Sequence, residues 1–281
     1  MSRVRAFARA AISGLVLGAM GGSAAAEEPP RRVVSMNLCT DQLAMLLAAP
    51  GQLVSVTYLA QDPSSSAMAE EARAYPENRG LAEEIFAFEP DLVIAGTYTT
   101  RATVGLLARL GVPVAEFAPA NGLEDIRDRL RQMGAVLGRE EQASRVLAEF
   151  DADLAEARVS GGLRPRAATY YANSYTSGRG SLAGSVIEAA GLDNLGATLR
   201  IEGGGRLPLE TLVTEQPDLV ITGRSFETPA LAQEVLAHPA LRALQAGTAP
   251  VADRDWVCGT PYVLAAIRRL AAARDLVLDR R

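Results

Sequence analysis

The sequence contains two copies of one pattern, which begin 127 residues apart. Residues 83–96 read EEIFAFEPDLVIAG, and residues 210–223 read ETLVTEQPDLVITG. Each copy joins a helix-like stretch to a Pro-Asp turn and an apolar run, the pattern of a helix that leads into a buried parallel strand. Solenoid repeats have shorter periods, of roughly 20–50 residues. The repeat therefore predicts two similar α/β lobes in one chain, with a ligand cleft between them.

The first 26 residues have the features of a secretory signal peptide. Arg3, Arg5 and Arg9 form a basic start, Ala11–Met20 is apolar, and Ala24–Ala26 fits a cleavage site after Ala26. The apolar stretch is too short for a permanent membrane span, and no cysteine follows it to carry a lipid anchor. An ordinary buried N-terminal helix is the alternative. We expect an exported protein without a membrane anchor.

The charge distribution disfavours nucleic acid as a partner. The 28 basic residues are all arginine, three of them in the leader, against 33 acidic residues. No basic stripe interleaved with aromatic side chains occurs in the sequence. The residues that follow the leader are numerous enough to build two lobes, each with a core of its own.

The order of expected elements alternates between strand and helix, as in a parallel sheet. In the first lobe, residues 27–138, we expect strands at 32–37, 53–58, 92–96 and 112–117, a helix capped by Thr40 or Asp41, and a helix at 103–110. In the second lobe, residues 161–281, we expect strands at 166–171 and 219–223 and a helix between Ser181 and Gly191. Further helices are expected at 229–237 and from Thr260-Pro261 to 276.

The middle of the chain predicts two consecutive helices instead. Apolar residues fall at 123, 126, 130, 133 and 137, and again at 143, 147, 150 and 154, which is helical spacing. We expect residues 139–160 to form one long helix that joins the lobes. A helical hairpin inside one domain is the alternative.

This organisation resembles the periplasmic substrate-binding proteins of ABC importers that carry metal chelates. The likeness covers the whole chain after the leader, and it is greatest to the members that bind vitamin B12. It rests on the order and spacing of three segments: Tyr175–Gly178, Ala190–Asn194 and the pair Asp255-Trp256. Such members are expected to have a tryptophan in the second lobe and an arginine shortly after the Asp-Trp pair. In this sequence the first position is at about Gly204 and the second is near Gly259.

The resemblance implies what such a protein does. The cargo would be a corrinoid, a ferric siderophore or haem, and the partners an importer permease and its ATPase. The chain would be a periplasmic monomer with no cofactor or metal of its own. A ligand sensor of the same fold is one alternative, and an exported enzyme is another, although no catalytic set of residues stands out.

Candidate ligand-binding residues follow from the rule that ligands lie beyond the carboxyl ends of parallel strands. Tyrosine and tryptophan faces suit a flat macrocycle, Arg101 or Arg224 could pair with its carboxylates, and loop packing is the alternative for each aromatic. The predicted set is Asn37, Cys39, Tyr58, Tyr98, Arg101, Tyr175, Arg224, Asp255, Trp256 and Cys258. The only histidine, His238, precedes a proline at a helix end and cannot assemble a bare-metal site alone.

Two further pairs of residues carry expectations. In the resembled family one glutamate on each lobe pairs with arginines of the permease, and Glu83 and Glu210 match these positions. As helix-start acids, they could also be purely structural.

Cys39 and Cys258 should border the cleft from opposite lobes. We favour two unpaired, partly buried cysteines, with a cross-cleft disulfide or a thiolate contact to ligand as alternatives.

Overall fold

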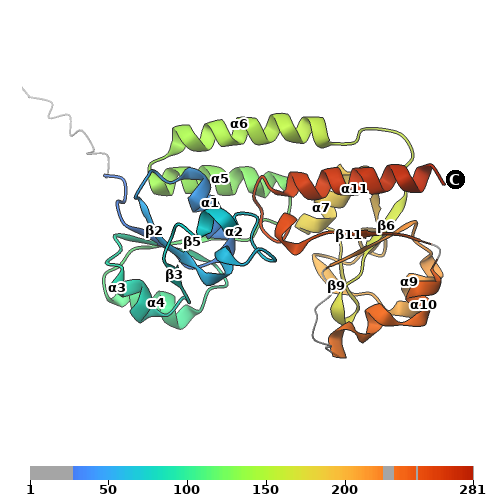
Figure 1. Ribbon diagram of the computed structural model, residues 1–281, viewed down its shortest axis with the longest axis horizontal. Helices are drawn as coiled ribbons and strands as arrows, with labels where there is room; N and C mark the ends of the chain where they lie inside the picture. The colour runs from blue at the N-terminus through green and yellow to red at the C-terminus, as the bar shows by residue number, and fades with distance from the viewer. Residues whose placement is uncertain (1–27, 224–230, 245, 281) are drawn as a thin grey trace, which may run out of the picture.

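The protein forms two α/β lobes that lie side by side, with long helices along one edge of both (Figure 1). The computed structural model describes residues 28–223, 231–244 and 246–280. The predicted signal peptide and Arg224 lie outside these ranges. No helix within the ranges combines the length and apolarity needed to cross a lipid bilayer.

The first lobe contains a five-stranded parallel sheet with strand order β3-β2-β1-β4-β5. Its central strands are buried because helices cover them, so they read as continuous apolar runs rather than alternating ones. The strands are β1 Val33–Ser35, β2 Leu53–Thr57, β3 Glu77–Asn78, β4 Leu92–Gly96 and β5 Val114–Phe117. The helices are α1 Leu38–Leu47, α2 Ala69–Ala72, α3 Ala82–Ala87 and α4 Arg101–Arg109, with a 3-10 turn η1 at Tyr58–Gln61.

The second lobe contains a four-stranded parallel sheet, order β11-β10-β6-β8, and a small antiparallel pair, β7-β9. The strands are β6 Arg166–Thr169, β7 Tyr175–Ser177, β8 Asp193–Asn194, β9 Gly204–Arg206, β10 Leu219–Thr222 and β11 Gly247–Pro250. The helices are α7 Leu182–Ala189, α8 Leu195–Thr198, α9 Leu209–Glu215, α10 Pro239–Ala243 and α11 Val263–Leu278. Short 3-10 turns are η2 Ala172–Ser174, η3 Leu231–Ala237 and η4 Asp253–Asp255. The prediction of two parallel-sheet lobes is confirmed.

Two helices in the middle of the chain lead from the first sheet to the second. They are α5, Leu123–Leu137, and α6, Glu140–Ala157, as the apolar spacing predicted. They pack closely because Gly134 has no side chain: a Cβ there would lie 2.5 Å from the Cβ of Ala143. Together with α11 they run along the same edge of both lobes (Figure 1). The domain boundaries expected at residues 138 and 160 stay predictions.

The sequence repeat has the same structural role in both lobes. Asp91 accepts hydrogen bonds from the backbone N–H groups of Arg31 and Arg32, and the Arg32 guanidinium donates to the carbonyls of Phe88 and Glu89. In the second lobe Asp218 accepts from the backbone of Arg166, whose guanidinium donates to the carbonyls of Glu215 and Gln216. Glu89 and Gln216 both have left-handed backbones, with φ of 47° and 46°. The repeat thus conserves the turn that fixes helix, strand and neighbouring strand together.

Some predicted helix ends differ from the observed ones. The cap of α1 is Asn37, whose Oδ1 accepts from the N–H groups of Cys39 and Thr40, and not Thr40 or Asp41. The chain turns into the helix directly after β1, so the shorter strand moves the cap forward. The last helix begins at Val263, three residues after Thr260. Ser181 caps α7 as predicted, and Gly191 follows it with φ of 76°.

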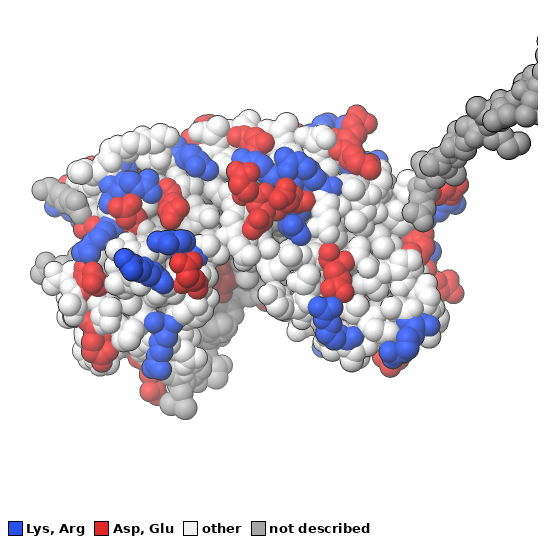
Figure 2. Space-filling model, turned by 180° about the vertical axis from the view of Figure 1, so that it is seen from behind, with Lys and Arg blue, Asp and Glu red and all other residues white. Residues whose placement is uncertain are grey.

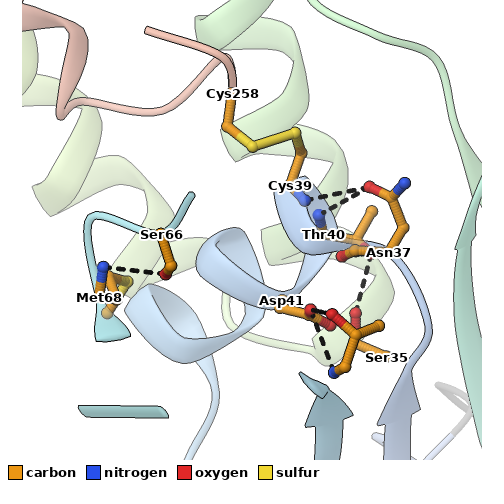
Figure 3. Close-up of a disulfide and its surroundings, with 9 residues drawn as sticks. Ser35, Asn37, Cys39, Thr40, Asp41, Ser66, Met68 and Cys258 are labelled. Atoms are coloured by element: carbon orange, nitrogen blue, oxygen red, sulfur yellow. Dashed lines mark hydrogen bonds between the residues drawn. A yellow bond between two sulfur atoms is a disulfide. The ribbon is translucent and has the colours of Figure 1, made fainter. Parts of the chain in front are cut away.

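A covalent bond joins the two lobes, contrary to the favoured prediction of two unpaired cysteines. Cys39, in the first turn of α1, forms a disulfide with Cys258, which precedes α11, and their Cα atoms are 5.1 Å apart (Figure 3). The prediction was wrong because two loops 219 residues apart in sequence meet only through the packing of the lobes, which the sequence pattern did not specify. The alternative of a cross-cleft disulfide is correct.

Two other contacts reinforce this joint. The Arg254 guanidinium donates a hydrogen bond of 3.1 Å to the carbonyl of Pro63 in the first lobe. Gly259 lies against Ala120, so closely that a Cβ at position 259 would be 2.1 Å from the Cβ of Ala120. The segment 254–259 is therefore seated on the first lobe.

A buried carboxyl group lies in the same helix turn as Cys39. Asp41 is fully buried below Cys39 (Figure 3). Its Oδ2 accepts hydrogen bonds from the backbone and the hydroxyl of Thr57. Its Oδ1 has no partner among the described residues. Burial raises the pKa of this carboxyl to about 7, and the neighbouring Ser35 hydroxyl and the hydrogen bonds from Thr57 oppose this effect only in part.

The disulfide leads to a prediction about thiol content and stability. The wild-type protein should show no reactive thiol when it is denatured without reductant. Replacing both cysteines by serine (C39S with C258S) should lower the free energy of unfolding by roughly 2–5 kcal/mol, because the closed loop is long. Thiol titration and urea unfolding measure the two effects. Wild-type protein treated with reductant is the matched control and should behave as the double variant. Two free thiols in the denatured wild type would contradict the pairing.

Asp41 leads to a prediction about pH. An unfolded aspartate has a pKa near 4, so the folded protein holds the proton more strongly, and this contribution to stability is complete below pH ~4 and lost as the pH rises through about 7. Asp41→Asn stays neutral, so its stability relative to wild type should increase between pH 5 and pH 8, by roughly 2–3 kcal/mol. Urea midpoints at both pH values measure this. A difference that does not change with pH would exclude a raised pKa.

Candidate ligand-binding site

A cavity of about 130 Å³ lies where the carboxyl ends of the first sheet meet the second lobe. Residues after β1, β4 and β5 form most of its wall, and Val257 and Gly259 close it from the second lobe. This is the edge of a parallel sheet at which ligands bind. The disulfide lies beside it, because Cys39 is itself part of the wall.

Three of the predicted ligand-binding residues line this cavity: Asn37, Cys39 and Tyr98. Asn37 uses its Oδ1 to cap α1, so its Nδ2 is directed away from the helix (Figure 3). The amide packs on Gly96, where a Cβ would lie 3.2 Å from Nδ2. The sulfur of Cys39 is engaged in the disulfide and has no thiolate to offer a ligand.

The three predicted tyrosines are exposed aromatic faces. Tyr98 is 88% exposed, Tyr175 46% and Tyr58 44%. The Arg79 guanidinium lies over the Tyr58 ring at 5.3 Å from its centroid, a cation–π contact. Exposed aromatic groups of this size cost free energy in water and favour a ligand that covers them.

Tyr175 occupies the space that a side chain at position 204 would need. A Cβ on Gly204 would lie 1.8 Å from the Tyr175 hydroxyl oxygen. The tyrosine ring also stacks on Tyr171, with centroids 6.4 Å apart. Tyr171 is half-buried, and burial together with the nearby Asp253 raises the pKa of its phenol well above the usual range. The two stacked rings therefore present a joint aromatic surface, and Tyr171 stays uncharged in it.

The other predicted residues do not line the cavity. Trp256 is only 6% exposed and packs in the hydrophobic core, so its indole shows no open face in this structure. Asp255 is held at the surface of that core between Arg254 and Arg269, at 3.7 and 3.8 Å. Arg101 is exposed and pairs with Glu116 at 3.3 Å. Their assignment as ligand-binding residues stays a prediction, and Arg224 lies outside the described residues.

Sequence reasoning missed one charged residue of the cavity wall, Arg129. It lies on α5, whereas the prediction considered only loops that follow strands. The sequence around Arg129 did not mark it as a site residue, because an arginine is an ordinary residue on the solvent side of an amphipathic helix.

The surface carries mixed charges on the face shown in Figure 2, where acidic and basic side chains lie among one another. Many form pairs along one helix, such as Arg131 with Asp128 and Arg145 with Glu141. Glu83 and Glu210 differ: both are exposed in the first turns of α3 and α9, and neither has an ion-pair partner among the described residues.

The described residues hold no group of three or more His, Cys, Asp or Glu side chains placed to bind a metal ion. The only histidine, His238, caps α10, and its Nδ1 accepts from the backbone N–H of Ala240 at 3.1 Å. The helix was expected at 229–237, and Pro229 lies outside the described ranges. The described residues 231–237 form the 3-10 turn η3, and α10 starts at Pro239.

The chain is similar to known binding proteins. A cobalamin-binding protein from Halobacterium salinarum is 28% identical over 222 residues, 76% of this chain and 59% of that protein. The match thus spans less than two thirds of that relative. A periplasmic haem-binding protein from Roseiflexus sp. RS-1, solved in its apo form, superimposes with a TM-score of 0.72 at 22% identity, over 88% of this chain and 98% of that one. A structure from the ABC-type Fe3+-hydroxamate transport system of Saccharomonospora viridis gives 0.64 at 21% identity, over 87% and 93%.

The family model described as periplasmic binding protein matches residues 33–249, a span that includes both sheets. Since this match covers most of the chain, and the solved structures share its two-lobed fold, the protein belongs to the periplasmic binding protein family.

Proposed function

We propose that this protein binds a metal chelate between its lobes and delivers it to an ABC importer. The observation that supports this best is the cavity at the carboxyl ends of the first sheet, closed by the second lobe and bordered by the exposed ring of Tyr98. Relatives and structural neighbours that bind cobalamin, haem or a ferric hydroxamate point to the same ligand class.

The residues of the site favour an intact chelate over a bare ion. Bare transition metals need several nitrogen, sulfur or carboxylate ligands, whereas the chain has a single histidine and two cysteines, both in the disulfide. A chelate brings its metal already coordinated, and the protein need supply only surface and hydrogen bonds. Tyr58, Tyr98 and Tyr175 offer such surface on both lobes.

The size of the cavity limits how the ligand lies. Pockets that enclose a small molecule measure roughly 300–1,000 Å³, and this cavity has about 130 Å³. It can admit one arm of a chelate and not its whole ring system. The remainder of the ligand would therefore lie between the lobes, across the exposed tyrosines.

A titration of the purified protein tests the ligand class. At least one of cobalamin, haem and a ferric hydroxamate should bind, and Tyr98→Ala should weaken that binding roughly 2- to 12-fold, the range for one aromatic stacking contact. Calorimetry measures the affinities. Phe86→Ala, an exposed aromatic on α3, is the matched control and should leave affinity unchanged. Failure of all three chelates to bind would refute the proposal.

Delivery predicts a role for Glu83 and Glu210. Both carboxylates are exposed, lie at equivalent places in the two lobes and have no partner among the described residues, so they are free to pair with cationic groups of a permease. Glu83→Arg with Glu210→Arg should abolish uptake in reconstituted vesicles through charge repulsion. Chelate affinity should change by less than about twofold, since neither residue lines the cavity.

The control for this experiment carries the same change in charge elsewhere. Glu149 and Glu156 are exposed on α6 without ion-pair partners among the described residues, and their replacement by arginine should leave uptake intact. Normal uptake by the Glu83/Glu210 variant would exclude these residues as the docking pair.

A further inference from the structure

Arg129 places a positive charge in the wall of the interlobe cavity. Its Nη1 donates a hydrogen bond of 2.8 Å to Oε1 of Gln132, one helical turn further along α5. Gln132 in turn donates through Nε2 to the backbone carbonyl of Glu116 at 3.0 Å. One side of the guanidinium is thus fixed in position by a chain of hydrogen bonds that ends on the first sheet.

The other side of the guanidinium has no partner. Nε of Arg129 is buried from solvent and donates to no acceptor, and no described residue accepts from Nη2. A buried donor without an acceptor costs about 1–3 kcal/mol, and more when it is charged. The free energy lost here is recovered when an acceptor from outside the described residues reaches this edge of the guanidinium.

The absence of a carboxylate distinguishes Arg129 from its neighbours among the described residues. Arg101, Arg127 and Arg131 each lie 2.6–3.3 Å from an acidic side chain, and Arg129 forms no such pair. Asp125, one turn earlier on α5, accepts instead from the backbone N–H of Asn121. The positive charge that faces the cavity is therefore not neutralised by the described protein.

The free atoms have the geometry of an anion site. Nε–H and one N–H of Nη2 point in the same direction from one edge of the guanidinium, which matches the two oxygens of a carboxylate. The Asn37 amide, whose Nδ2 is not needed for the cap, and the Tyr98 hydroxyl border the same cavity and can donate as well. The cavity volume of about 130 Å³ suits a short side arm.

We propose that Arg129, on α5, forms a subsite for a carboxylate-bearing arm of the bound chelate. This inference rests on the proposed function, and it adds a criterion for the ligand: chelates with free carboxylates bind better than the same chelates with neutral amide or ester arms. The disulfide beside the cavity fixes the second-lobe residues Val257 and Gly259 over this arm.

The test compares ligands that differ only in the charge of the arm. Haem and its dimethyl ester form one matched pair, and a cobalamin monocarboxylic acid and cobalamin form another. With whichever pair binds, wild type should prefer the acid roughly 10- to 100-fold, as expected for a charge-assisted bidentate contact. Arg129→Gln should lose this preference while retaining affinity for the neutral ligand.

The control is Arg131→Gln, which removes the same charge from an exposed position two residues further along α5 and should keep the preference for the acid. Equal affinity of wild type for acid and neutral ligand would overturn the subsite while leaving the proposed function intact, and that comparison needs no variant. Retained preference in Arg129→Gln would also overturn it. If no chelate of either pair and no ferric hydroxamate binds, the proposed function fails and the subsite with it.

Discussion

The close attachment of segment 254–259 to the first lobe is the contact on which the site depends. The disulfide of Cys258 with Cys39, the hydrogen bond from Arg254 to Pro63 and the packing of Gly259 on Ala120 all act within six residues. Without them Val257 and Gly259 would not close the cavity, because they belong to the other lobe. The cavity is therefore a product of tertiary contact, and neither lobe holds it alone.

This explains which parts of the molecule the sequence could predict. The two lobes follow from local chemistry: Asp91 and Asp218 accept from the start of a neighbouring strand, and the turns before them have a left-handed residue at the same position. Such features depend on a few adjacent residues and leave a repeated pattern in the chain. The long apolar stripes of α5 and α6 were readable for the same reason.

The site was only partly predictable because it combines segments that no periodicity connects. The pairing of Cys39 with Cys258 depends on how the lobes pack, and the contribution of Arg129 depends on which side of α5 faces the cavity. Trp256 was expected to face ligand, and in this structure its indole packs in the hydrophobic core, which no periodicity of the sequence indicated. The rule that ligands lie beyond the carboxyl ends of parallel strands predicted where the cavity lies. Which side chains line it depends on tertiary packing.

The chain differs from the pattern that its resemblance to B12-binding members implied, but it keeps an aromatic surface. Where a second-lobe tryptophan was expected, Gly204 leaves room for the ring of Tyr175, which stacks on Tyr171. Where an arginine was expected, Gly259 is required by the contact with Ala120. A positive charge is present nonetheless, on Arg129 in the opposite wall.

One of these differences places the positive charge on α5 instead of the segment before α11, and the disulfide beside the cavity has a mechanical consequence. With the Cα atoms of Cys39 and Cys258 held 5.1 Å apart, the lobes cannot separate at the cavity, and any opening has to be a rotation about this point. Arg129 and Cys39 both line the cavity, whereas Tyr58 and Tyr175 lie outside its wall. Under the proposed function, the charged arm of a chelate would therefore bind beside the disulfide, and its rings would lie against Tyr58 and Tyr175 outside the cavity wall.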